Sequence, residues 1–256
     1  KNTENVLTTE VGSKRVRDPF IGRDKNGDFI ILATHGWDNP DIYIWKSKDL
    51  VIFDQLSNLK VSVYDPFLNI TGNRAWAPEF YYDKDQDNYV VYFSDPNGEN
   101  AHDGHIYYVL TKNFENVSYV SSLINTEYPI IDGTLTTLDG EIWLFYKDEH
   151  SKSVFMAKTT TLLKSGWELY DKEFIFKLRN VEGPFIVKND NVSYLYIDMY
   201  KQQKFYVACF TNLGVDNDLT WFDQTLYQLP ENDVRHGSSI SITQKELDII
   251  KNYYGE

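Results

Sequence analysis

The segment Arg17-Asp18-Pro19-Phe20-Ile21 returns in four related forms along the chain. These forms read Pro78-Glu79-Phe80-Tyr81-Tyr82, Ile131-Asp132-Gly133-Thr134-Leu135, Val181-Glu182-Gly183-Pro184-Phe185 and Arg235-His236-Gly237-Ser238-Ser239. The key residues are numbers 18, 79, 132, 182 and 236, so successive gaps are 61, 53, 50 and 54 residues. A repeat of this length is typical of structural units that are stacked or arranged around an axis.

Each repeat also contains short runs of aromatic and β-branched residues between turn residues. Asn88–Ser94 and Glu141–Tyr146 are such runs, and each is followed by another, His105–Val109 and Ser153–Ala157 respectively. Asp-Gly and Asn-Gly steps between runs favour hairpins, because these residues accept a positive φ. The pattern predicts about four antiparallel strands in each unit.

Five such units predict an all-β fold, a five-bladed β-propeller that forms a single domain over residues 1–256. The blades are expected to start near residues 16, 76, 130, 180 and 234. An open β-sandwich is the alternative, but it does not account for acids that recur at related positions. The stretch Thr243-Gln244-Lys245-Glu246 fits a capping box and predicts a short C-terminal helix.

Charge and composition exclude several classes of partner. The 256 residues carry a net charge of −13, which repels nucleic acid and anionic membrane surfaces. No apolar stretch approaches the roughly 18 residues of a transmembrane helix. The one cysteine, Cys209, excludes a disulfide within the chain and a cysteine-based metal site. The polar first residues do not fit a signal peptide, so the compartment stays open between cytoplasmic and secreted with the signal removed.

Three carboxylic acids stand at the starts of predicted units: Asp18, Asp132 and Glu182. Two carboxylates that flank a glycosidic bond can hydrolyse it, one by donating a proton to the leaving oxygen and the other by activating water or attacking the sugar. A third acid nearby can tune the protonation of the donor through like-charge repulsion. His236 offers a fourth polar group at the start of the last unit.

These segments, together with Trp76-Ala77-Pro78-Glu79, resemble glycoside hydrolase family 43, whose members are five-bladed propellers and include arabinofuranosidases and xylosidases. The resemblance spans about residues 15 to 250 and follows the family's order of motifs. It implies an inverting hydrolase that requires no cofactor, in which Asp18 is the general base and Glu182 the general acid. Asp132 would modulate the pKa of Glu182 and hold its orientation. His236 would lie on the axis, where related enzymes often place a water-coordinated calcium or another small ion.

Several other residues are candidates for binding a carbohydrate substrate. Trp76 would line the sugar subsite, and Glu79 and Arg235 belong to the same set of motifs. His35 and Trp37 follow a predicted strand of the first unit, where they can face a pocket. Lys147 follows the corresponding strand of the third unit, and we expect it to lie at the solvated rim.

The favoured function is hydrolysis of terminal arabinofuranose or xylose residues in plant polysaccharides or oligosaccharides. A galactan-active exo-glycosidase and a non-catalytic carbohydrate-binding propeller are the alternatives. The three intact acids argue against the binding module, because binding alone does not require crowded carboxylates. The residues do not specify the sugar, the linkage, exo or endo cleavage, or the oligomeric state.

Overall fold

A computed structural model describes residues 6–61, 64–65, 70–72, 74–96, 105–164, 166–170, 178–190, 192–202, 204–210, 220–222 and 235–255. The chain divides into two compact units, which are described separately below. Unit 1 consists of Lys1–Tyr92, Tyr108–Ser121 and Ser239–Glu256, and unit 2 of Phe93–Tyr107 and Ser122–Ser238.

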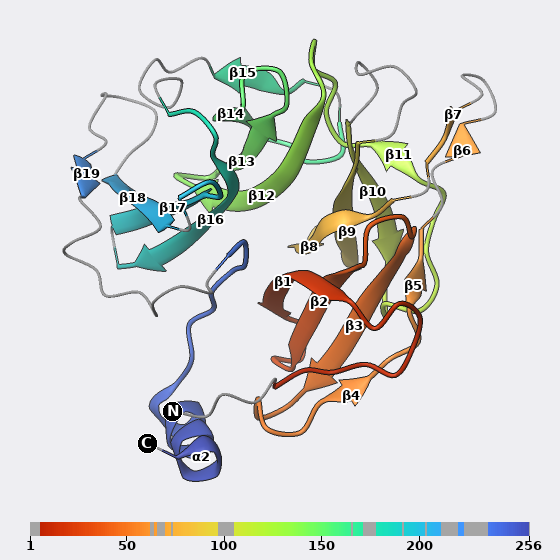
Figure 1. The fold of residues 1–256 in the computed structure, drawn as a ribbon, viewed down its shortest axis with the longest axis vertical. Helices are drawn as coiled ribbons and strands as arrows, with labels where there is room; N and C mark the ends of the chain where they lie inside the picture. The colour runs from red at the N-terminus through yellow and green to blue at the C-terminus, as the bar shows by residue number, and fades with distance from the viewer. Residues whose placement is uncertain are drawn as a thin grey trace. The chain divides into compact units, whose positions relative to one another are not determined.

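The first sheet belongs to unit 1 and has the strand order β1-β2-β3-β4, with β5 also paired to β3 (Figure 1). Its strands are β1 (Val16–Arg23), β2 (Phe29–His35), β3 (Asp41–Ser47), β4 (Asp54–Gln55) and β5 (Leu59–Lys60). The turn from β1 to β2 is fixed by Asp24, whose carboxylate accepts hydrogen bonds from the backbone of Asn26 and Asp28. Alternate residues of β2 and β3 form the core of this sheet: Phe29, Ile31, Ala33, Tyr43 and Trp45.

The second sheet has the order β11-β10-β9-β8, and a separate two-stranded sheet joins β6 to β7. The strands are β6 (Tyr64–Asp65), β7 (Ile70–Thr71), β8 (Trp76–Asp83), β9 (Asn88–Asp95), β10 (His105–Thr111) and β11 (Ser121–Ser122). The central strand β9 is buried along nearly its whole length, in agreement with its apolar and aromatic sequence.

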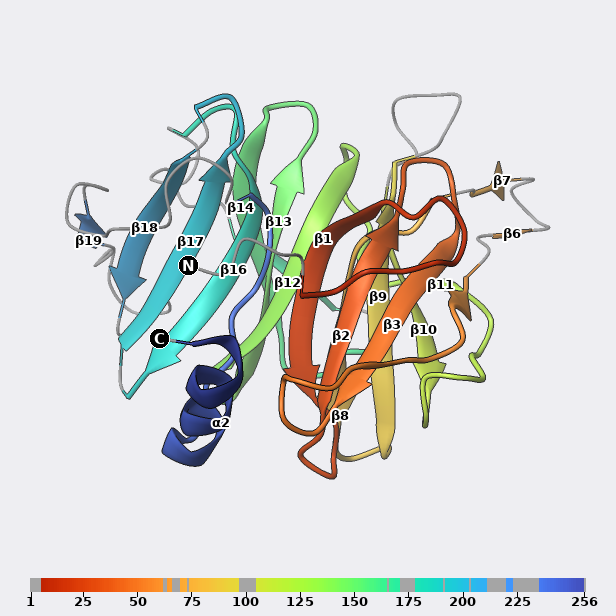
Figure 2. The same cartoon turned by 60° about the horizontal axis from the view of Figure 1, so that its bottom comes forward.

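The third and fourth sheets belong to unit 2, and in each the strands follow one another in chain order. The long strands of the fourth sheet lie side by side in Figure 2. The third contains β12 (Ile130–Leu138), β13 (Glu141–Asp148), β14 (Ser153–Thr159) and β15 (Glu168–Tyr170). The fourth contains β16 (Glu182–Asn189), β17 (Val192–Met199), β18 (Lys204–Phe210) and β19 (Thr220–Phe222). They share one hydrophobic cluster, to which Trp143, Phe145, Leu195 and Ile197 contribute.

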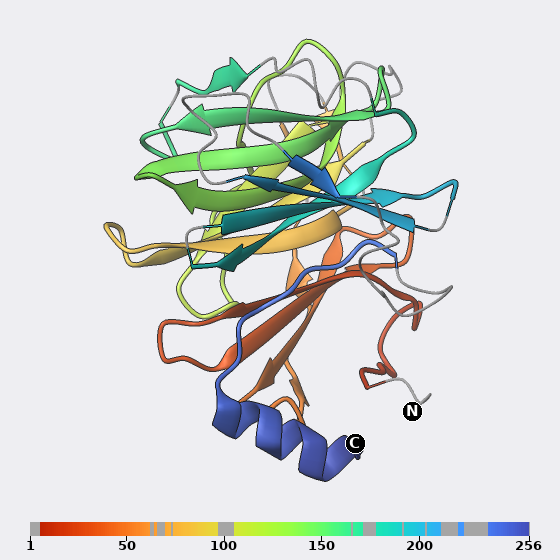
Figure 3. The ribbon, with the colours of Figure 1, turned by 90° about the vertical axis from the view of Figure 1, so that its left-hand side faces the viewer.

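The helix α2 (Gln244–Tyr254) starts at the predicted capping box. The Thr243 side chain accepts a hydrogen bond from the Glu246 backbone, and the Glu246 carboxylate accepts one from the Thr243 backbone. The helix lies against the first sheet (Figure 3), where Arg23 pairs with Glu246 at 3.0 Å and the Tyr254 hydroxyl donates to the Leu50 carbonyl at 3.1 Å. Within the described part of the chain, no helix has the length and apolar character needed to cross a membrane.

The sheets confirm an all-β fold of the propeller type with one C-terminal helix, but the described residues form four blades and not five. The expected start of a fifth blade near residue 234 lies at the edge of a stretch outside the described residues, 223–234. From residue 235 onward the described chain contains no strand. Its last part is helical because the capping box at Thr243 starts α2 only a few residues after the fifth motif.

Candidate active site

A bulge of one extra residue interrupts the first strand of three sheets at the same point. Such a bulge changes the direction in which a side chain points, and bulges are frequent beside active sites. The pairs that flank it are Arg17↔Thr34 and Phe20↔Leu32 in β1, Ile131↔Lys147 and Thr134↔Phe145 in β12, and Glu182↔Asp198 and Phe185↔Tyr196 in β16. The predicted repeat is therefore present in the backbone as well as in the sequence.

Each bulge contains a residue with positive φ, namely Asp18 (46°), Asp132 (54°) or Gly183 (53°). In β8 the corresponding residue is Ala77 (45°). Aspartate accepts this region more readily than most other residues, which suits it to this position. The expected equivalence of the acids thus holds for Asp18 and Asp132 but is wrong elsewhere: Glu182 stands one residue before the shared position, and Glu79 is two residues past Ala77.

Asp18 is held in unit 1 by a hydroxyl group and remains partly accessible. The Thr34 hydroxyl donates to Asp18 Oδ2 at 3.0 Å and accepts from the Ala77 backbone N–H at 2.8 Å. Arg17 Nη2 lies 3.7 Å from the same carboxylate oxygen, and the Asp18 side chain is 16% exposed. A carboxylate in this position is oriented by fixed neighbours and can still reach a water molecule.

Two tryptophans, Trp37 in the turn after β2 and Trp76 at the start of β8, meet beside Arg17. The Arg17 guanidinium lies 3.8 Å from the ring centroid of Trp37, and the rings of Trp37 and Trp76 meet edge to face at 5.1 Å. The Trp76 indole N–H donates to the Trp37 carbonyl at 2.8 Å. Trp37 nevertheless remains 51% exposed, so this arrangement presents a fixed aromatic surface.

His35 and Glu79 are buried. The Glu79 carboxylate accepts a hydrogen bond from the Tyr92 hydroxyl at 2.5 Å. His35 Nε2 accepts one from the Ser13 backbone N–H at 2.8 Å, and burial lowers the pKa of His35 although the charge of Asp41 opposes this shift. Both residues have structural partners, and their roles in substrate binding stay predictions.

Asp132 connects three segments of unit 2. Its backbone N–H donates to the Ser94 hydroxyl at 2.9 Å, and its Oδ2 accepts from the Gly183 backbone N–H at 3.2 Å. His236 Nδ1 lies 3.8 Å from the same oxygen. Position 183 requires glycine, because its φ is positive and an added Cβ would lie 2.7 Å from the His236 ring.

Glu182 lies between two cations. Its Oε2 is 2.8 Å from Lys147 Nζ, and its Oε1 is 3.3 Å from Arg235 Nη2. The series continues on both sides, because Lys147 also contacts Glu149 at 2.7 Å and Arg235 Nε contacts Asp198 at 2.9 Å. The five side chains form a row of alternating charges centred on Glu182.

Two members of this charge row, Lys147 and Asp198, are buried, which affects their protonation. Burial lowers the pKa of Lys147, but the charges of Asp132 and Glu182 and the hydrogen bonds to Glu149 and Glu182 outweigh it, so the pKa is raised. Burial raises the pKa of Asp198, and Arg235 opposes this shift only in part. Lys147 therefore remains a cation over the whole range in which an enzyme works.

The burial and ionic contacts of Lys147 and Asp198 were not predicted from the sequence. We expected Lys147 at a solvated rim, but it is only 5% exposed, and Asp198 was not singled out. Their register provides the missing signal: Lys147 and Asp198 occupy the same position in their sheets as Thr34 in the first. A charged residue that replaces a hydroxyl at this position of an otherwise apolar strand indicates a local ionic partner.

The described residues do not fit a calcium ion held directly by protein ligands. Calcium binds six to eight oxygens, whereas His236 and Asp132 supply one ring nitrogen and one carboxylate. No group of three or more His, Cys, Asp or Glu side chains placed to hold a metal occurs in the described part of the chain. An ion bound at His236 through water stays a prediction.

The structure thus brings the predicted residues together in two groups. Asp18, Trp37 and Trp76 are gathered in unit 1. Asp132, Glu182, Arg235 and His236 are gathered in unit 2. Each group combines a carboxylate at the start of a blade with aromatic or cationic neighbours.

Comparison with known proteins identifies the class as a glycoside hydrolase. Residues 1–248 match a family described as a probable glycosyl hydrolase domain and related to glycoside hydrolase family 43, and the chain belongs to this family. This membership confirms the family resemblance predicted from the sequence and the enzyme class that goes with it.

Individual relatives are more distant. The chain is 24% identical over 240 residues to an alpha-L-arabinofuranosidase from Bifidobacterium longum subsp. longum, in a match that covers 73% of this chain but only 22% of that protein. An exo-beta-1,3-galactanase from Clostridium thermocellum has 15% identity and a TM-score of 0.66, with 85% of this chain and 51% of that chain covered. A family 43 enzyme from Xanthomonas citri, solved with xylotriose, has 14% identity and a TM-score of 0.60, with coverage of 81% and 72%. At these identities the solved structures support the fold and not the substrate.

Proposed function

We propose that the protein is an inverting glycoside hydrolase that removes terminal arabinofuranose or xylose residues from plant polysaccharides or oligosaccharides. One observation carries the proposal: the three candidate acids of a glycosyl hydrolase family sequence lie at the blade starts, each held by named polar partners. The sugar is inferred from the distant arabinofuranosidase relative and from the xylotriose bound by a structural neighbour.

In the proposed reaction, Asp18 takes a proton from the water that attacks the anomeric carbon, while Glu182 gives a proton to the departing glycosidic oxygen. A bond forms between the water oxygen and the anomeric carbon as the glycosidic bond breaks, and the configuration at the anomeric carbon inverts. The Thr34 hydroxyl bonded to Asp18 keeps that carboxylate oriented toward the water.

Asp132 and the two cations act on Glu182 as positioning groups in this proposal. Asp132 reaches the adjacent residue, because its carboxylate accepts the Gly183 N–H. Lys147 and Arg235 each contact one carboxylate oxygen, which restricts the rotation of the carboxyl group. Trp37 and Trp76 supply an aromatic surface for the apolar face of a sugar ring.

The test is release of nitrophenol from aryl α-L-arabinofuranosides, β-D-xylosides and β-D-galactosides, with Asp18→Asn as the matched control. We expect turnover of an arabinofuranoside or a xyloside that the substitution abolishes. Turnover of the galactoside alone would replace the proposed sugar with the galactan alternative. Oligosaccharide binding without turnover of any aryl or natural glycoside would support the non-catalytic alternative.

A further inference from the structure

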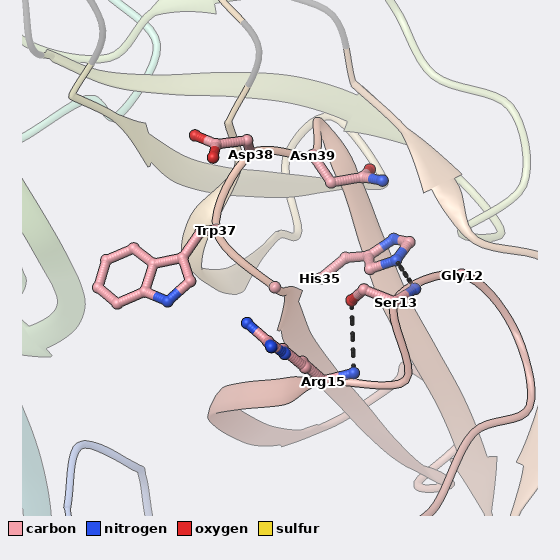
Figure 4. Close-up of a pocket in the computed structure, with 8 residues that line it drawn as sticks. Gly12, Ser13, Arg15, His35, Trp37, Asp38 and Asn39 are labelled. Carbon is pink, nitrogen blue, oxygen red and sulfur yellow. Dashed lines mark hydrogen bonds between the residues drawn. The ribbon is translucent and has the colours of Figure 1, made fainter.

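A pocket of about 610 Å³ opens on unit 1 between the segment that precedes β1 and the turn that follows β2 (Figure 4). Its polar and aromatic lining comprises Ser13, Arg15, His35, Trp37, Asp38 and Asn39. We propose that this pocket is a sugar subsite for a second, neutral monosaccharide unit of an oligosaccharide substrate. This inference rests on the proposed function. It implies that the substrate is an oligosaccharide of which the enzyme binds at least two sugar units.

The Arg17 side chain connects the pocket to the candidate base, Asp18. Trp37 lines the pocket and stacks on the Arg17 guanidinium at 3.8 Å, and Arg17 in turn lies 3.7 Å from Asp18. All three residues belong to unit 1. A sugar placed against Trp37 would therefore neighbour the sugar that reacts at Asp18.

The aromatic surface is fixed before any ligand arrives. Arg17 and Trp76 pack against the Trp37 ring, and the Trp76 indole N–H holds the Trp37 backbone at 2.8 Å. The next residue, Asp38, is paired with Arg74. A surface that is already ordered loses little conformational entropy when a ligand binds, and this favours affinity.

The opposite wall is also built into the fold. His35 Nε2 accepts the Ser13 N–H at 2.8 Å, and the Tyr43 hydroxyl donates to the Val11 carbonyl at 2.8 Å. Only glycine fits at position 12, because its φ is 65° and an added Cβ would overlap the His35 ring at 2.1 Å. The segment before β1 is therefore anchored to β2 and β3 and forms a defined wall.

The chemistry of the lining favours a neutral sugar over other small ligands. The Ser13 hydroxyl, the Arg15 guanidinium and the Asn39 side chain supply donors and acceptors that match vicinal hydroxyl groups. The lining carries one cation, Arg15, and one anion, Asp38, which is paired with Arg74 at 2.6 Å. The exposed face of Trp37 suits the apolar side of a pyranose or furanose ring.

Calorimetric titration with xylotriose, arabinotriose and β-1,3-galactotriose, and with the corresponding monosaccharides, tests the proposal. Asp18→Asn serves as the background that prevents turnover. We expect one trisaccharide to bind at least about tenfold more tightly than its monosaccharide. Trp37→Ala should remove most of this difference. Arg15→Ala, at an exposed residue whose loss leaves the core intact, should weaken trisaccharide binding by roughly fivefold to tenfold.

Tyr119→Ala is the matched control, because Tyr119 is an exposed aromatic residue of the same unit outside the pocket. The proposal is overturned if no trisaccharide binds better than its monosaccharide, or if Trp37→Ala and Arg15→Ala bind like Tyr119→Ala. If trisaccharide binding depends on Trp37 but the wild-type enzyme, with Asp18 intact, hydrolyses no trisaccharide, the pocket proposal is upheld and the proposed reaction is rejected. If the trisaccharide is hydrolysed and both Trp37→Ala and Arg15→Ala keep the wild-type KM, the proposed reaction is upheld and the pocket proposal is rejected.

Discussion

Replacing Lys147 by methionine tests how Glu182 is held. Methionine preserves much of the apolar length of lysine and removes its charge. The Lys147 side chain is 6% exposed and contacts Glu182 and Glu149 at 2.8 and 2.7 Å. Breaking a fully buried ion pair costs about 3–5 kcal/mol, because an unpaired charge remains inside the protein.

The cost is smaller here. The side chains of Glu182 and Glu149 are 22% and 26% exposed, and each keeps a second cation, Arg235 or Lys152. Solvent screening and these remaining partners reduce the expected loss of stability to about 1–2 kcal/mol. For a chain of this size that corresponds to a fall in Tm of roughly 2–8 °C. Without Lys147 the Glu182 carboxyl group can rotate more freely, and we expect kcat to fall by about tenfold for this reason.

The assay combines thermal unfolding with kcat and KM on the responsive aryl glycoside. Lys147→Arg should recover most of the loss, since it restores a cation at the same position. Lys158→Met is the control, because Lys158 pairs with Glu141 at 3.1 Å in the same sheet but is more exposed, and the kcat of this variant should equal that of wild type.

The pKa of Lys147 is raised, so its charge is present in the folded state at any pH below the ordinary value of 10.5. The difference between Lys147→Met and wild type should therefore be constant from about pH 6 to 9. A Lys147→Met protein with wild-type Tm and kcat would refute this account of Glu182.

Three further predictions concern single residues. Burial lowers the pKa of His35 below 6.5, so as the pH falls the unfolded chain takes up a proton before the folded protein does. The stability of the fold should therefore decrease as the pH drops from about 6.5 toward the pKa of His35 in the folded protein. His35→Asn should reduce this pH dependence in thermal unfolding measured across pH. Gly183→Ala forces a Cβ to 2.7 Å from the His236 ring at a positive φ, and we expect a loss of about 2–4 kcal/mol in denaturant unfolding together with reduced kcat; normal values would show that the loop can relax. Thr243→Ala removes the N-cap of α2 and should cost about 1 kcal/mol in unfolding with kcat unchanged, whereas lost activity would show that the helix affects the reaction.

The sequence predicted most strands because their signals are local. Alternating aromatic and β-branched runs between Asp-, Asn- and Gly-rich turns placed β9, β13 and β14 within a few residues of their observed bounds. The capping box placed the start of α2 for the same reason. The number of blades could not be obtained in this way, because a repeated first motif does not ensure that strands follow it. Arg235-His236-Gly237 has the motif, but the described chain continues into a helix.

The candidate site was predictable only in part. The acids stood out because carboxylates recur at related positions, and the backbone shows Asp18 and Asp132 in equivalent bulges. The partners of Glu182 depend on register between strands, which the sequence does not state. A lysine at the end of a strand looks solvated in sequence, and only pairing with Ile131 and contact with Glu182 reveal that Lys147 is buried.

The assignment of Glu182 as the proton donor is the central claim, and the leaving group tests it most directly. The measurement compares kcat/KM of Glu182→Gln with that of wild type on the responsive nitrophenyl glycoside and on the oligosaccharide of the same sugar. Nitrophenol departs with little protonation, whereas a sugar hydroxyl requires it. We predict that Glu182→Gln loses far more activity on the oligosaccharide than on the nitrophenyl glycoside. Equal losses on the two substrates, or an unchanged rate on the oligosaccharide, would contradict the assignment.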